Sequence, residues 1–346
     1  MVDIFLLRDG EIAIRQGLTE PIQHVEIEKI KNILKEASEY DTVSGGGAAN
    51  VAKIAGLLGA GVSFTGALGK DDSGAESSDE YGRLFEKELS AAGVKLRLAL
   101  KSSPTGICLY FKAGSETQIA ASPSAAALLS EDDIDWDELE ESKLLLIDGF
   151  TLNKTGLIRR LLGIAAGKGI ITAIDLGSRE IAKEMALSIT EYVRQNPLIL
   201  FMSEAEASAF YEGLGSPGEK EMEKETPPGT DRRSSDTRFR SACSYFRSFT
   251  KGEFYPVIVV KLGPRGALTF SSGNIHRAET TAVTPCESTG AGDTFCAAFL
   301  TAWLRNKSLH ECTILGNKAA RLILDVTGTG IDKTRMQSLS RQLNLS

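Results

Sequence analysis

The sequence predicts an α/β protein built around a doubly wound, mainly parallel sheet. Two observations carry this prediction. Four short, continuous apolar runs occur from residue 143 onward, and stretches with helical periodicity separate them. Continuous apolar strands are typical of parallel sheets covered by helices on both faces, which gives three layers. The runs lie at residues 143–148, 170–175, 197–202 and 256–262, and the helical stretches lie at 154–168, 179–194 and 204–213.

The first half of the chain predicts helices and a strand pair. Residues 25–39 place apolar side chains on one helical face, and a second helix is expected to run from Gly47 to about Val62. Residues 105–111 indicate a strand that pairs with 116–121 across a turn at Gly114.

One segment breaks the pattern. Residues 213–240 contain almost no apolar side chains and are rich in Pro, Gly, Ser and charge. Such a composition buries too little surface to order itself, so we expect a flexible surface insertion there.

The composition limits the classes of protein to consider. The chain has 346 residues, 42% of them hydrophobic and 25% charged, which is typical of a globular protein of one large or two smaller domains. Its net charge of −7 provides no overall positive field for nucleic acid or anionic lipid. No apolar run reaches the roughly 18 residues that span a bilayer, and an acid stands where a signal peptide would be basic. We therefore expect a cytoplasmic protein that binds neither nucleic acid nor membranes.

The five cysteines and three histidines are scattered along the chain. None has the spacing of a zinc site or of a disulfide framework. Any chemistry is therefore expected to use carboxylates.

The strongest functional signal is residues 288–293 (STGAGD), which an apolar helix follows directly. The first N–H groups of a helix have no partner within it, and together with the helix dipole they form an anion site. Asp293 could take a proton from a hydroxyl while the amides of Gly290, Ala291 and Gly292 hold the charge of a transferred phosphoryl group. The alternative is that Asp293 merely caps the helix, as Asp commonly does. The Gly-Ala-Gly before it favours a functional role.

A second glycine motif, residues 45–50 (GGGAAN), also precedes a helix. It narrowly misses the dinucleotide-binding pattern, and residues 41–44 make a poor first strand for such a fold. Glycine lets a ligand approach the backbone closely, and Asn50 can donate and accept hydrogen bonds to hydroxyls. The alternative is an ordinary tight turn.

Two further segments follow apolar strands. Residues 261–267 (KLGPRGA) leave the end of one strand, and Glu206 comes four residues after another. Ligands collect at the carboxyl ends of strands in open α/β sheets, so both segments are expected in the same layer.

In this order, the two glycine motifs resemble the signatures of the ribokinase/PfkB family of carbohydrate and nucleoside kinases. The first signature is matched from Gly45 through Asn50 to Gly69, and the second from Ser288 to Asp293. Within the family the sequence is most similar to the adenosine-kinase-like branch. The resemblance implies one ribokinase-like kinase domain over residues 1–346, with a small β lid from segments near 4–18 and 98–121.

The resemblance also implies a function, namely ATP-dependent transfer of the γ-phosphoryl group to a hydroxyl of a sugar or nucleoside, with Mg²⁺. Asp293 would be the base, and Gly290, Ala291 and Gly292 would form the anion hole. The residues implied to hold the acceptor are Asp3, Gly46, Gly47 and Asn50. The residues implied to line the nucleotide site are Ser203, Glu206, Lys261, Gly263, Gly266 and Asn317. Glu206 would help to organise Mg²⁺ through water, and a homodimer through the lid is allowed.

Three departures from the family pattern bear on these expectations. Ser203 stands where the family has Asn, and Glu287 stands where it usually has an Asp near its monovalent-cation loop, which counts against K⁺ activation. Relatives also have a complete strand before the residue equivalent to Asp3, so we expect that the start is placed too late or that this strand has been lost.

Two alternatives to a kinase stay open. The first is a non-catalytic descendant that binds a sugar or nucleotide, although such a binder would not need Asp293. The second and weaker one is a dinucleotide oxidoreductase. The sequence does not name the acceptor.

Overall fold

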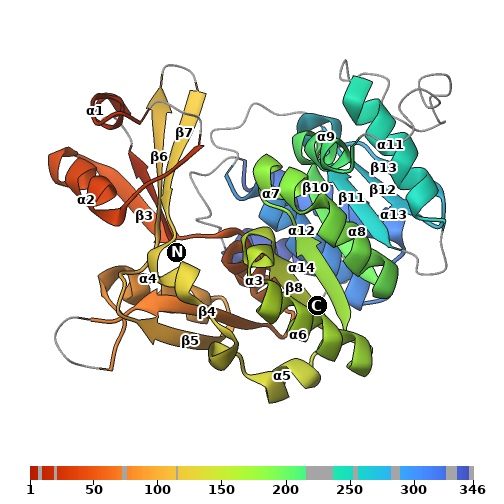
Figure 1. Cartoon of the computed structure of the whole chain (residues 1–346), viewed down its shortest axis with the longest axis horizontal. Helices are drawn as coiled ribbons and strands as arrows, with labels where there is room; N and C mark the ends of the chain where they lie inside the picture. Colours follow the sequence, from red (N-terminus) through yellow and green to blue (C-terminus); the bar gives the residue numbers. More distant parts are fainter. Residues whose placement is uncertain are drawn as a thin grey trace.

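The computed structural model describes residues 1–6, 10–18, 22–71, 76–113, 116–215, 237–251, 256–281, 289–324 and 333–342. These residues form a large sheet and a smaller sheet beside it, with a two-stranded pair below the smaller one (Figure 1). None of the described helices is long and apolar enough to cross a membrane.

The large sheet has six strands in the order β13-β12-β11-β10-β9-β8. Strands β8 to β11 are parallel, whereas β12 and β13 are antiparallel to their neighbours. The parallel strands match the four apolar runs that the sequence indicates, whereas the β12–β13 hairpin was not predicted. The bounds are β8 Leu144–Asp148, β9 Ile171–Asp175, β10 Leu198–Ser203, β11 Val257–Lys261, β12 Ala267–Ser271 and β13 Asn274–Ala278.

Helices cover both faces of this sheet. One face is covered by α6 (Thr155–Lys168), α7 (Arg179–Glu184), α8 (Ala186–Gln195), α9 (Glu204–Gly213) and α11 (Thr237–Phe249). The other face is covered by α3 (Gly47–Leu57), α12 (Ala291–Leu304) and α13 (Leu309–Leu322), beside α14 (Lys333–Gln342).

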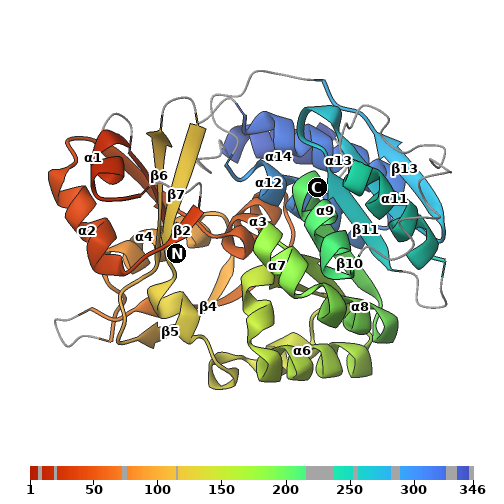
Figure 2. The same ribbon diagram turned by 45° about the horizontal axis from the view of Figure 1, so that its top comes forward.

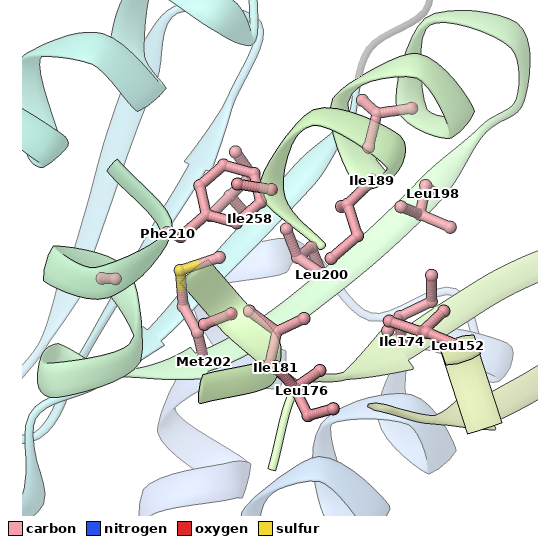
Figure 3. Packing of buried hydrophobic residues seen from close by; sticks show 14 of the residues in the cluster. Leu152, Ile174, Leu176, Ile181, Ile189, Leu198, Leu200, Met202, Phe210 and Ile258 are labelled. Carbon is pink, nitrogen blue, oxygen red and sulfur yellow. The ribbon is translucent and has the colours of Figure 1, made fainter. Parts of the chain in front are cut away.

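Strand β10 shows why three layers form. Leu198, Leu200 and Met202 point to the first group of helices, where Ile189 and Phe210 pack against them (Figure 3). The intervening residues, Ile199 and Phe201, point to the opposite group. A strand that is apolar on both faces must be covered on both, because alternate side chains leave it in opposite directions.

The smaller sheet has five strands in the order β2-β7-β6-β1-β3. Helices α1 and α2 cover one of its faces, where Val2, Ile4 and Leu6 are buried among them. Alternation along β1 therefore turns Asp3 and Phe5 to the other face, and Phe5 stacks on Tyr110 with ring centroids 4.7 Å apart. The bounds are β1 Val2–Leu6, β2 Ile22–His24, β3 Tyr40–Ser44, β6 Ile107–Ala113, β7 Glu116–Ser122, α1 Gly10–Arg15 and α2 Ile27–Glu36.

The remaining described elements are a strand pair with the helix between its strands, and five short helices. Strands β4 (Ser63–Gly69) and β5 (Lys95–Lys101) form a parallel pair, with α4 (Glu80–Ala91) between them in sequence. The short helices are η1 Ser124–Leu128, η2 Glu131–Asp133, α5 Trp136–Glu140, η3 Gly149–Asn153 and η4 Gly263–Arg265.

Several predicted boundaries differ from the structure. The helix expected to reach about Val62 ends at Leu57, because Gly59 takes a left-handed φ of 86° and turns the chain away. The stretch 179–194 forms two helices that meet at Met185.

The expected lid and insertion segments lie partly outside the described residues. Within the lid segments, residues 98–101 belong to the β4–β5 pair and residues 10–15 are helical, while residues 7–9 and 114–115 are not described. In the expected insertion, residues 216–236 are not described either, and α11 begins at Thr237.

Two helical glycines differ in the space around them: Gly56 near the end of α3, and Gly163 within α6. A Cβ on Gly56 would overlap the carbonyl oxygen of Ala92, whereas a Cβ on Gly163 would have no atom within 4 Å. Gly56→Ala should therefore lower the free energy of unfolding by about 1–3 kcal/mol, the range for overpacking. Gly163→Ala is the matched control, and it should raise that free energy by about 0.5–1 kcal/mol, because alanine is the better helix former. Urea denaturation measures both, and equal effects would show that α3 has room to shift.

Candidate active site

The candidate site lies where three parts of the fold meet. Asp148, Asp175, Ser203 and Lys261 are the last residues of the parallel strands β8 to β11. Strand register places Asp148 beside Asp175 and Ser203 beside Lys261. The N-terminal ends of α3 and α12 reach the same edge, and α3 lies between the two sheets (Figure 2). Ligands bind at this edge in open α/β sheets.

Asp293 is the third residue of α12 and does not cap it. The cap position is taken by Gly290, whose φ of 79° is left-handed and which has no side chain to offer. The alternative role for Asp293, that of a helix N-cap, is therefore wrong. Gly290, Ala291 and Gly292 start the helix, where backbone N–H groups lack partners within it and the dipole is positive. Ser288, at the start of the motif, lies outside the described residues.

Asn50 joins the two glycine motifs. It lies on α3, only 3% exposed, and its Nδ2 donates to Asp293 Oδ2 over 2.8 Å. Among the described residues its Oδ1 has no hydrogen-bond partner. Buried polar atoms in native proteins are nearly always paired, so this oxygen is available to a ligand.

Asp3 is a buried carboxyl without a partner. It is 1% exposed, and neither of its oxygens accepts a hydrogen bond from any described residue. It packs against Gly45, where a Cβ would overlap the carboxyl group. Desolvation and the charge of Asp293 raise the pKa of Asp3 to about 7. An unpaired buried carboxylate is costly, and ligand hydroxyls could offset that cost.

Asp293 titrates in the same range. Desolvation and the nearby charge of Asp175 raise the pKa of Asp293 to about 7, against the opposing effect of the Asn50 hydrogen bond. A carboxylate with this pKa is well matched to taking a proton near neutral pH.

Asp148 belongs to the site although the sequence did not single it out. Its Oδ1 accepts from Phe150 N at 2.8 Å and its Oδ2 from Ala48 N at 3.4 Å. A Cβ on Gly47 would lie 3.4 Å from Asp148 Oδ2 and 3.7 Å from Asp293 Oδ1, so both carboxyls lie close to this glycine. Burial raises the pKa of Asp148.

Lys261 lies beside the start of α12. Its Nζ lies 3.0 and 3.1 Å from the two oxygens of Asp175, and 3.3 Å from where a Cβ on Gly292 would be. Cys296 donates to Asp175 over 3.1 Å. Burial alone would lower the pKa of Lys261, but Asp175 raises it above its ordinary value. A fixed positive charge therefore lies beside the start of α12.

Ser203 and Glu206 bond to each other. Glu206 N donates to Ser203 Oγ over 3.2 Å, and Ser203 N donates to Glu206 Oε2 over 2.8 Å. This is a capping box at the start of α9, and burial raises the pKa of Glu206. Among the described residues no group of three or more His, Cys, Asp or Glu is placed to hold a metal ion.

The last three predicted positions shape one corner of the sheet. Gly266 has a left-handed φ of 88°, and a Cβ there would overlap the carbonyl oxygen of Ala278. Asn317 on α13 donates to the same oxygen over 2.9 Å, and Gly263 begins the turn with a φ of 57°. Their nucleotide contacts stay predictions.

Comparison with known proteins identifies the family. Residues 17–335 match the pfkB family of carbohydrate kinases. The chain belongs to this family. The protein is therefore a kinase of the carbohydrate and nucleoside class, whose members use ATP. The matched residues begin after Asp3, so family membership by itself assigns that residue no role.

Named relatives include kinases of two acceptor types. The chain is 25% identical over 305 residues to adenosine kinase 2 of Arabidopsis thaliana, which covers 83% of this chain and 79% of that protein. It is 36% identical over 93 residues to 2-dehydro-3-deoxygluconokinase of Haemophilus influenzae, but this covers only 26% of this chain and 29% of that protein. The crystal structure of adenosine kinase from Sinorhizobium meliloti superimposes with a TM-score of 0.79 at 22% identity, covering 99% of this chain and 96% of that one. This likeness confirms the predicted ribokinase-like fold of the pfkB kinase.

The burial of Asp3 predicts a pH-dependent stability. Because its pKa is raised in the folded state, the folded protein loses stability as pH rises from about 4, where the unfolded carboxyl ionises, to about 7. Asp3→Asn removes this loss. The melting temperature of the variant relative to the wild type should therefore be higher at pH 8 than at pH 5. Asp41→Asn, at an exposed position on β3, is the control and should show no such trend. An Asp3 variant whose relative melting temperature is the same at both pH values would contradict the burial argument.

Proposed function

We propose that this kinase transfers the γ-phosphoryl group of ATP to a hydroxyl of a sugar or nucleoside, with Asp293 as the base. The observation that carries the proposal is the Asn50–Asp293 hydrogen bond of 2.8 Å. It fixes the carboxylate of Asp293 in the first turn of α12, close enough to the unpartnered carboxyl of Asp3 for its charge to raise the pKa of Asp3. The amides of Gly290, Ala291 and Gly292 would stabilise the charge on the group in transfer.

The two sides of Asp293 suit different substrates. On one side, Asp3 and Asn50 offer unpaired oxygens to acceptor hydroxyls, and Gly46 and Gly47 allow a close approach to the backbone. On the other side, the nucleotide phosphates would meet positive charge from Lys261 and the α12 terminus. Ser203, Glu206, Gly263, Gly266 and Asn317 would border the nucleotide there.

The site fits Mg²⁺ only as an ion carried by the nucleotide. Mg²⁺ is commonly held by one or two carboxylates, phosphates and water, so the absence of a three-ligand group in the described structure is compatible with it. Glu206 would contact its water shell. When bound, the ion would neutralise negative charge on the phosphates.

One observation favours the alternative of a non-catalytic binder. The capping box already engages both Ser203 and Glu206, and the family pattern that the sequence resembles has Asn at the position of Ser203. If this pairing prevents Glu206 from serving the nucleotide, ATP would bind without being consumed. ADP release across a panel of sugars and nucleosides distinguishes the two functions.

Removal of the base should abolish most of the activity. Asp293→Asn keeps the shape and can still accept from Asn50, but it cannot take a proton from the acceptor. We expect kcat to fall by roughly 10² to 10⁴, with the KM for ATP little changed and no loss of melting temperature. ADP release measured by a coupled assay checks this, and Asp135→Asn, a helix-capping position outside the site, is the control. Wild-type turnover in the Asp293 variant would rule out the proposed base.

The raised pKa of Asp293 predicts the pH profile. The base acts only when it is deprotonated, so kcat/KM should rise with pH up to about 7 and level off above. The residual activity of Asp293→Asn should lack this rise. Rates measured from pH 5.5 to 9 test it, and a wild-type rate that falls steadily as pH increases across this range would refute the assignment.

A further inference from the structure

Three carboxyl groups from distant parts of the chain converge on one short backbone segment. Asp3 comes from β1, Asp148 from the end of β8 and Asp293 from α12. Asp3 packs against Gly45, and oxygens of Asp148 and Asp293 both lie near the position that a Cβ on Gly47 would take. Three acids thus border the glycine motif on the acceptor side of the site.

The basic groups that the structure describes near these acids are engaged elsewhere or disfavoured as cations. Lys53 Nζ is buried and bonds to Ser44 Oγ at 2.9 Å and to Glu88 Oε2 at 3.4 Å. Lys261 is held by Asp175. Burial lowers the pKa of the Met1 amino group.

Asp148 can still accept hydrogen bonds. A carboxylate offers about four acceptor positions, and two of those of Asp148 are taken by backbone N–H groups. The remaining ones suit a hydroxyl or N–H of an acceptor. A carboxylate on the acceptor has no hydrogen to donate to Asp148, and it would place a further negative charge beside the Asp148 carboxylate.

On the basis of the proposed function, we infer that Asp148 is a specificity-determining residue that selects uncharged acceptors and excludes sugar acids. The effect has two parts. A carboxylate in the acceptor is repelled by Asp148, and like charges strongly disfavour each other where solvent is displaced. The negative charge of the acceptor carboxylate would also favour the protonated form of Asp293, and a protonated Asp293 cannot act as the base. Neutral sugars and nucleosides cause neither effect.

The test compares acceptors of both charges in the wild type and in Asp148→Asn. Adenosine, D-ribose and D-fructose are the neutral acceptors, and 2-dehydro-3-deoxy-D-gluconate and D-gluconate are the acids. For the wild type, the best neutral acceptor should exceed the best acid at least 100-fold in kcat/KM. In Asp148→Asn, which keeps an oxygen to accept from Phe150 N, this ratio should fall about 10-fold or more.

The ratio separates a charge effect from a structural one. A variant that merely loosened η3 would lose activity with neutral and acidic acceptors alike and would leave the ratio unchanged, which would overturn the inference. Asp135→Asn removes a comparable helix-capping carboxylate far from the site and should also leave the ratio unchanged.

Failure of the inference is distinguishable from failure of the proposed function. A wild type that releases ADP best with a sugar acid remains a kinase but refutes the role of Asp148. If no acceptor supports ADP release, the proposed function fails, and thermal shifts with the same acceptors without ATP then test the inference alone. The inference is supported if neutral acceptors raise the melting temperature more than acids do and if Asp148→Asn narrows this difference. It is refuted if acids raise the melting temperature more than neutral acceptors do, or if no neutral acceptor raises it.

Discussion

The hydrogen bond between Asn50 and Asp293 is the interaction on which the site depends. It joins residues 243 positions apart, one near the start of α3 and one near the start of α12. The two helices also pack through apolar side chains, with Val51 and Ile54 in the same buried cluster as Phe295 and Phe299. This packing fixes the distance between the two glycine turns, and the hydrogen bond fixes the direction of the carboxylate. A side chain held by packed helices is placed more accurately than one on a loop.

The same arrangement concentrates groups that oppose folding. Asp3 is desolvated and unpaired, and the charge of Asp293 raises its pKa further. It is nevertheless held in place, because β1 pairs with β3 on one side and β6 on the other, and Val2, Ile4 and Leu6 are buried on the opposite face. The apolar face of one strand thus stabilises a polar residue on its other face. Functional sites commonly reduce stability in this way.

The sequence predicted the central sheet well, because β8 to β11 are apolar on both faces and most of the helices between them keep clear periodicity. It did not predict β12 and β13, whose hairpin mixes polar and apolar residues, or the β4–β5 pair. The glycine motifs pointed to Asp293 and Asn50 because each motif is local. Asp148 and Asp175 have no local signature, since an acid at the end of a strand gains meaning only when register places it beside another. The capping box at Ser203 was not predicted, although Ser-x-x-Glu is its usual pattern.

Asp175 explains how Asp293, the proposed base, can have a raised pKa so close to a lysine. The charge of Lys261 lowers the pKa of Asp293, whereas that of Asp175 raises it, and Asp175 has the larger effect. If Lys261 were unpaired, it would attract Asp293 directly, and a carboxylate so stabilised would be a weak base. Because both oxygens of Asp175 lie about 3 Å from Lys261 Nζ, the lysine stays beside the start of α12. The Asp175–Lys261 pair thus leaves positive charge on the side proposed for phosphate, and it leaves Asp293 with a high proton affinity on the side proposed for the acceptor. A lysine bonded directly to Asp293 could not provide both.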